Sequence, residues 1–134
     1  MNRSAVLFAA LAASLVAALP ALAQGGPQSV SRHNDWEVAY LTEQGNRVCY
    51  AFTRTIRSEG APSGRTPPVV TVTHRGTSRD QVALLSGLAL PANTEVAVEV
   101  GDAKFQFYTG GGSAFARDGK AVVTALQKGR EAVF

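Results

Sequence analysis

The chain has 134 residues, of which 13 are Lys or Arg and 10 are Asp or Glu, so its formal net charge is +3. A charge this small, spread along the chain, argues against a nucleic acid as the partner. The two histidines and one cysteine occur in no metal-ligand spacing such as CxxC or HExxH, which argues against a metal site. We predict neither a metal nor another cofactor.

The first 23 residues have the pattern of a secretory signal peptide. Arg3 supplies a basic start, residues 5–19 form an apolar run rich in alanine, and Ala21-Leu22-Ala23 provides the small residues that a signal peptidase reads. The apolar run is shorter than the ~18 residues that a membrane-spanning helix needs. We therefore expect cleavage before Gln24, no stable membrane anchor afterwards, and a periplasmic or secreted protein.

The segments after the signal peptide predict a leader, a hairpin, a loop and a strand, in that order. Residues 24–34 are polar and begin with Gly-Gly-Pro after Gln24, which predicts a flexible leader. Residues 36–41 and 48–53 alternate between apolar and polar side chains, and the turn residues between them predict a β-hairpin. Residues 57–68 are rich in Ser, Gly, Pro and Arg and predict a long exposed loop. Residues 69–74 are rich in β-branched side chains and predict a third strand.

A fourth strand is expected at residues 81–85, and the clearest local pattern follows at residues 95–108. There Gly101-Asp102 suits a two-residue hairpin turn. Pairing outward from this turn places Val98 opposite Phe105 and Glu99 opposite Lys104, with Val96, Val98, Val100, Phe105 and Phe107 on one face.

The C-terminal part of the sequence predicts a flexible glycine crossing at residues 109–113 and a short helix. Asp118 is a suitable N-cap for a helix over residues 119–128, and Gly129 closes it. Residues 131–134 begin a further strand. The sequence therefore predicts one mainly-β domain over residues 35–134, a small antiparallel β-sandwich-like domain with one short C-terminal helix.

Nucleophilic catalysis requires a Ser or Cys beside a base and an orienting acid. His33 and His74 are the candidate bases, but no Gly-x-Ser-x-Gly motif occurs. We expect both imidazoles to be solvated or hydrogen-bonded at a strand end. We assign no catalytic residue and predict that the protein is not an enzyme; the alternative is a small exported hydrolase that uses His33 or His74.

Cys49 is the single cysteine of a chain that the signal peptide directs to an oxidising compartment. Three explanations remain open from composition: a buried inert thiol, a disulfide to another chain, or a partner missing from this sequence. Its place within a strand favours a buried or bridged thiol over a nucleophile. Among the neighbouring aromatic residues, Trp36, Tyr40 and Tyr50 are candidates for a ligand-binding surface, although strand spacing favours the core.

Several segments follow one another in a recognisable order across residues 34–134. They are Asn34–Tyr40, Arg47–Ala51, Val70–Arg75, Glu95–Val100, Phe105–Tyr108, Ser113–Phe115 and Ala125–Gly129. In this order and spacing they resemble the invasion-associated locus B family of alphaproteobacterial exported proteins. That family opens its mature domain with a Gly/Asn-Asp-Trp strand and a Val-Cys-Tyr strand.

The resemblance implies an exported, non-catalytic binding or accessory protein whose partner is an unknown protein or another component of the cell envelope or host. Family members generally continue beyond the position of Phe134 through a further strand and a closing helix that ends in Cys. The resemblance therefore implies that these parts are missing here, together with a disulfide partner for Cys49. A third hypothesis is a truncated fragment without a function of its own.

Overall fold

The computed structural model describes residues 25–134, and the expected signal peptide lies outside the described residues. Nine strands and one helix occur in this range. The strands are β1 (Gln28–His33), β2 (Trp36–Glu43), β3 (Asn46–Arg54), β4 (Val69–Arg75), β5 (Ser78–Leu85), β6 (Glu95–Val100), β7 (Ala103–Gly110), β8 (Ser113–Ala116) and β9 (Ala132–Val133), and the helix is α1 (Gly119–Lys128).

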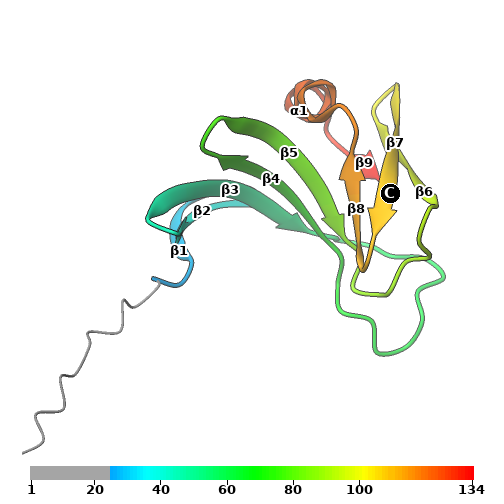
Figure 1. The fold of residues 1–134 in the computed structure, drawn as a ribbon. Coiled ribbons are helices and arrows are strands. Elements are labelled where there is room, and N and C mark those ends of the chain that lie inside the picture. The colour runs from blue at the N-terminus through cyan, green and yellow to red at the C-terminus, as the bar shows by residue number, and fades with distance from the viewer. Residues whose placement is uncertain (1–24) are drawn as a thin grey trace, which may run out of the picture.

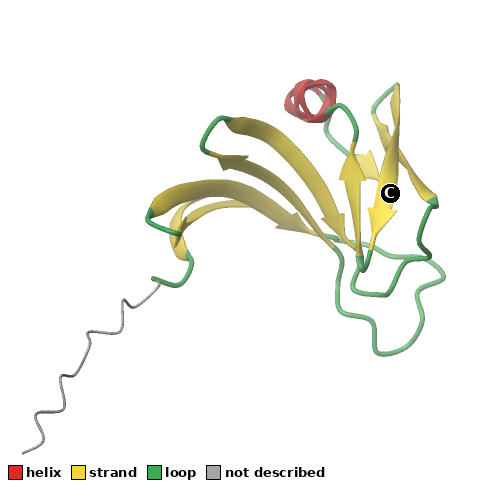
Figure 2. Ribbon diagram, viewed as in Figure 1, coloured by secondary structure: helices red, strands yellow, loops and turns green. Residues whose placement is uncertain are grey.

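The nine strands form one antiparallel sheet in the order β1-β2-β3-β4-β5-β8-β7-β6-β9. Figure 1 shows that this sheet is strongly curved and that α1 lies in the space between β5 and the β6–β7 hairpin. The predicted mainly-β domain with one short C-terminal helix is confirmed. Its strands are hydrogen-bonded into one continuous sheet, and the helix closes the core against it (Figure 2).

The β6–β7 hairpin has the predicted register at every pair. Val98 lies opposite Phe105, and Glu99 lies opposite Lys104. Gly101 has a φ of +57° at the first position of the turn, a conformation that glycine adopts without steric cost. The alternation of apolar and charged side chains fixes this pairing locally, since a one-residue slip would bring Glu99 onto the buried face.

Register divides the strand residues between two faces, which we call the inner face, turned towards α1, and the outer face, turned away from it. The inner face holds the core. Its buried members are Val70, Val82, Leu84, Val98, Val100, Phe107 and Ala114, joined by Val122 of α1. Phe107 and Val98 have no exposed surface, so the middle of the sheet is closed on this side.

The helix is held over the inner face by its first turn. The carboxylate of Asp118 accepts a hydrogen bond from the Ala121 N–H at 3.0 Å, which confirms the predicted N-cap. Gly119 packs directly on β5, where a Cβ atom would collide with the Asp80 carbonyl oxygen. The helix ends at Gly129 as predicted, but its φ is −81°, so this glycine is required by contact with Val100 rather than by a left-handed backbone.

Two predicted flexible segments are ordered. The expected leader contains β1, which pairs with β2 through a bulge between Ser29 and Ser31. This strand is held by backbone pairing, and its exposed side chains give no apolar alternation, so the sequence pattern does not show it. The glycine crossing is the tight turn between β7 and β8, with Gly110 opposite Ser113 and Gly111 at a φ of +62°.

Candidate binding surface

One row of side chains crosses the outer face from β2 to β6. Each of seven neighbouring strands contributes one residue, because the paired positions continue from strand to strand. In order, the row is Glu37, Phe52, Thr71, Ala83, Phe115, Tyr108 and Glu95. We call it the outer row. It has aromatic side chains on both sides of a centre made of small side chains.

Two aromatic pairs flank that centre. The ring centroids of Tyr50 and Phe52 are 5.8 Å apart, and those of Tyr108 and Phe115 are 5.5 Å apart. None of these rings belongs to the inner core, and Tyr108 is 42% exposed. Nearby on the same face, Leu85 is 43% exposed. Half-exposed rings of this kind offer apolar surface that a partner can cover.

One arginine side chain lies over one ring of each aromatic pair. The guanidinium carbon of Arg54 lies 5.3 Å from the centre of the Phe52 ring, and that of Arg117 lies 5.4 Å from the centre of the Tyr108 ring. Both distances are within the range of a cation–π contact. The two halves of the outer row therefore have the same construction, an aromatic pair with a guanidinium over one of its rings.

The strand glutamates of the outer face are all paired with cations. The nitrogen–oxygen distances are 3.1 Å for Arg32–Glu37, 2.9 Å for Arg75–Glu43, 2.9 Å for Arg117–Glu95 and 3.1 Å for Lys104–Glu99. Each pair is partly exposed, so its contribution to stability is small. Its effect on recognition is larger, because no strand glutamate on the described outer face is left without a compensating charge.

The Arg75–Glu43 pair also covers part of the sheet. Arg75 on β4 and Glu43 on β2 lie on either side of β3, and two nitrogens of the guanidinium fork bond the two carboxylate oxygens, at 2.9 and 3.2 Å. Val48 lies between them on β3 and is only 3% exposed. Hydrogen bonding to Arg75 lowers the pKa of Glu43, and hydrogen bonds from Ser29 and then Arg32 lower the pKa of Glu37.

The three aromatic residues predicted to form a binding surface do not lie on one surface. Tyr40 is opposite Cys49 in the β2–β3 pair, whereas Tyr50 is opposite Ala39, so Tyr40 and Tyr50 point to opposite faces. Trp36 shares the inner face with Tyr40 and packs against the core. Trp36 thus has the core position that strand spacing favours. The three candidates do not form one surface because the register between β2 and β3 places Tyr50 on the other face.

The predicted buried thiol is wrong for the described residues, since Cys49 is free and exposed there. A disulfide from Cys49 to another chain stays a prediction. Cys49 is on the inner face, between Tyr40 of β2 and His74 of β4. This part of the inner face lies outside the buried cluster under α1. A central strand is expected to be covered on both sides, but the ten-residue helix is too short to cover β2 and β3 as well.

The histidines have different surroundings. His74 lies near the end of β4, and its Nδ1 atom accepts a hydrogen bond from the Asp80 N–H at 3.0 Å, which confirms the predicted strand-end role. Its other nitrogen then carries the proton when the ring is neutral. His33 is exposed in β1, opposite Trp36. No hydrogen bond joins either imidazole to a serine or a carboxylate among residues 25–134.

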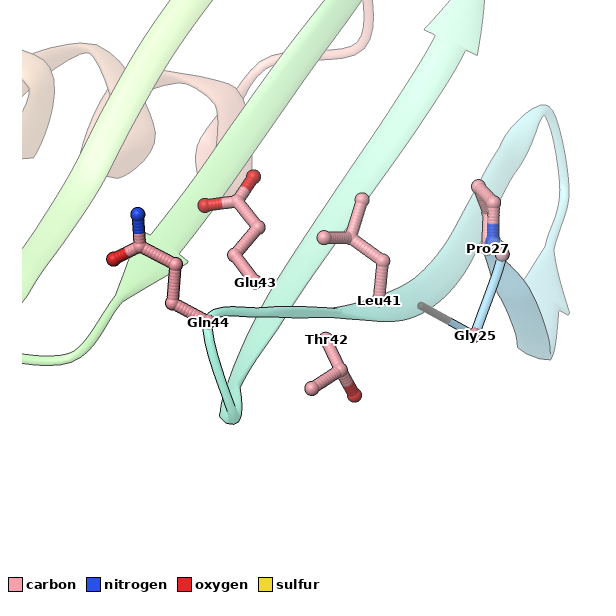
Figure 3. Close-up of a pocket in the computed structure, with 7 residues that line it drawn as sticks. Gly25, Pro27, Leu41, Thr42, Glu43 and Gln44 are labelled. Atoms are coloured by element: carbon pink, nitrogen blue, oxygen red, sulfur yellow. The ribbon is translucent and has the colours of Figure 1, made fainter. Parts of the chain in front are cut away.

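Two shallow hollows occur away from the outer row. The first, shown in Figure 3, has a volume of about 490 Å³ and is lined by residues 25–27 and 41–44. Glu43 and Leu41 point to one side of the strand there and Thr42 to the other (Figure 3). Glu43 is already bound by Arg75. The second hollow is enclosed by the loop that runs from Thr55 to Pro68, and its volume is about 290 Å³.

Residues 25–134 contain no cluster of three or more His, Cys, Asp or Glu side chains arranged to hold a metal ion. Within the same range, no helix has the length and apolar character needed to cross a membrane. Comparison of the chain with protein-family models, with curated proteins and with solved structures found no match.

Sequence reasoning misses Phe115 and Tyr108 as surface residues. The hairpin register correctly predicts that Tyr108 lies opposite Glu95. Phe115 belongs to β8, a four-residue strand that follows the glycine turn and carries no strong strand pattern of its own. Recognising Gly111-Gly112 as a hairpin turn would have continued the register to Phe115 and revealed the outer row.

Proposed function

We propose that this protein is an exported, non-catalytic binding or accessory protein of the invasion-associated locus B type, which works in the periplasm or outside the cell. Export is supported by the signal-peptide pattern of residues 1–23, and the type by the ordered resemblance over nearly all of residues 35–134. The partner is a component of the cell envelope. A link to host interaction is part of what the resemblance implies.

The outer row is the observation that supports the binding role. It spans seven strands, it combines aromatic side chains with compensated charges, and its Tyr108 side chain is 42% exposed. Interaction surfaces are typically rich in aromatic residues and arginine and poor in unpaired charge. The inner face carries the hydrophobic core, which packs against α1.

The binding role is tested by sedimentation of the purified mature protein with a washed envelope fraction from an alphaproteobacterium. We expect the protein to pellet with the envelope, and the Tyr108→Ser variant to remain in the supernatant. The matched control is Tyr40→Ser, which removes the same kind of side chain from the inner face and should still pellet. Equal behaviour of both variants, or no sedimentation of the parent protein, would refute the outer row as the binding surface.

The non-catalytic role is tested with the His33→Ala, His74→Ala double variant. Binding to the envelope should be unchanged, and thermal melting shows whether the fold is retained. A hydrolytic activity of the parent protein that disappears in a folded double variant would favour the exported hydrolase instead.

Export is tested by producing the full chain in a bacterial host and measuring the mass of the protein in the periplasm or medium. A mass that begins at Gln24 supports the proposal. An intact chain that is retained in the cytoplasm contradicts it.

A further inference from the structure

We propose that the outer row binds an uncharged oligosaccharide laid across the strands. This inference rests on the proposed function, since it names the chemical class of the partner for the same surface. A pyranose ring has an apolar face of C–H groups and a rim of hydroxyls, so a site for it needs aromatic surface next to small polar groups. The outer row provides both, in a repeated arrangement.

The charge distribution favours an uncharged ligand. Every strand glutamate of the described outer face has a cation within 3.1 Å. Arg117 is used by Glu95, so Arg54, which lies over the Phe52 ring, is the arginine of the two aromatic pairs that has no carboxylate partner among the described residues. A polyanion would find few free cations on this surface, and a polycation would find no free strand glutamate among the described residues. Complementarity of potential is therefore best for a ligand without net charge.

The spacing of the aromatic pairs favours an extended ligand. Phe52 is on β3 and Phe115 is on β8, with β4 and β5 between them. Neighbouring strands lie about 4.8 Å apart, so the two pairs are separated by roughly 14 Å. A short oligosaccharide that lies perpendicular to the strands can contact one aromatic pair at each end.

The centre of the outer row is made of small side chains with polar neighbours. Thr71 and Ala83 lie between the aromatic pairs, and Thr73 and Gln81 continue the same two strands on the same face. Threonine hydroxyls can donate and accept hydrogen bonds, and the amide nitrogen of Gln81 can donate, while its oxygen accepts from Arg75 at 3.3 Å. They can therefore meet the hydroxyl rim of a sugar whose C–H face stacks on the rings. A proline-rich peptide would use the aromatic rings but offers few hydrogen-bond donors to this centre.

The test uses the mature protein, cellotriose and chitotriose as uncharged probes, and amide chemical shifts measured by nuclear magnetic resonance. At least one probe should shift the amides of Phe52, Thr71, Phe115 and Tyr108 in a saturable manner. Shifts confined to the inner face, or no shift at millimolar probe concentration, would overturn the proposal. Binding of a proline-rich peptide to the outer row in place of both sugars would also overturn it.

Two variants separate ring stacking from general apolar contact. Tyr108→Leu and Phe115→Leu keep an apolar side chain and should retain the fold, which the amide spectrum itself reports. Each should weaken sugar binding about ten-fold, the change expected when a well-packed aromatic contact is lost. Tyr40→Leu on the inner face is the matched control and should leave binding unchanged. Equal affinities of all three variants and the parent would contradict stacking on the outer row.

The two assays distinguish failure of the sugar proposal from failure of the proposed function. Sedimentation with the envelope that depends on Tyr108, without binding of either sugar, would refute the sugar and keep the binding role. Failure of both assays would refute both proposals.

Discussion

The two faces of the sheet differ in what covers them. On the inner face, Phe107 and Val98 are completely buried beneath neighbouring strands and α1. On the outer face, Phe115 and Tyr108 stand in contact with each other, Arg117 lies over the Tyr108 ring, and Tyr108 keeps 42% of its surface exposed. The two pairs of residues therefore serve different ends. Burial makes the first pair structural, and exposure leaves the second available to a partner.

Replacing a buried ring should have the largest effect on stability. Phe107→Ala removes a completely buried side chain and should lower the free energy of unfolding by about 3–5 kcal/mol. Phe115→Ala on the outer face should cost less, about 1–2 kcal/mol, because the space it leaves is open to water. Urea unfolding measures both. Equal losses would remove the distinction between the faces; if Phe107→Ala does not fold, Phe107→Leu provides the comparison.

The contact between α1 and β5 should be the next most sensitive feature. Gly119→Ala places a methyl group against the Asp80 carbonyl oxygen, so the helix must shift away from the inner face. We expect a loss of about 1–3 kcal/mol in unfolding free energy. Gly26→Ala is the control, since a Cβ atom there would have no neighbour within 4 Å. A stability unchanged by Gly119→Ala would show that this contact does not hold the helix against the core.

The contrast between the faces also explains how much of the fold and of the candidate site the sequence predicts. The strands from β2 to β7, the Gly101 turn and the Asp118 cap follow from local features and are predicted correctly, whereas β1 and β8 are not predicted. Register across several strands is not local. It separates Tyr40 from Tyr50 and brings Phe52, Phe115 and Tyr108 into one row. The exposure of Cys49 depends on the reach of α1 over the sheet, which strand alternation does not encode.

The N-cap of α1 offers a smaller and more specific change. Asp118→Ala leaves the Ala121 N–H without its side-chain acceptor and should lower the unfolding free energy by about 1 kcal/mol. Asp118→Asn keeps an acceptor oxygen and should retain most of the stability. Urea unfolding of both variants makes the comparison. If the two are equally destabilised, the charge of Asp118 rather than its hydrogen bond holds the helix against the inner face.

The ion pair over Val48 should give the smallest effect, and one that depends on pH. Hydrogen bonding to Arg75 lowers the pKa of Glu43 below its ordinary value of 4.5 in the folded protein. A carboxyl group with a lowered folded pKa stabilises the fold fully above its unfolded pKa, and this contribution is lost as the pH falls through the folded pKa. The stability difference between the parent and Glu43→Gln should therefore be constant near neutral pH and shrink below about pH 4.5.

Urea unfolding at a series of pH values measures that difference, and Arg75→Gln completes a double-mutant cycle. The coupling between Glu43 and Arg75 should disappear with the same pH dependence, because protonated Glu43 no longer attracts the guanidinium. A coupling that persists at low pH would mean that the pair acts by covering Val48 with its side-chain stems, not by charge. In that case the side-chain stems of Arg75 and Glu43 cover the outer face at Val48 by packing. The exposed aromatic surface is then confined to the outer row.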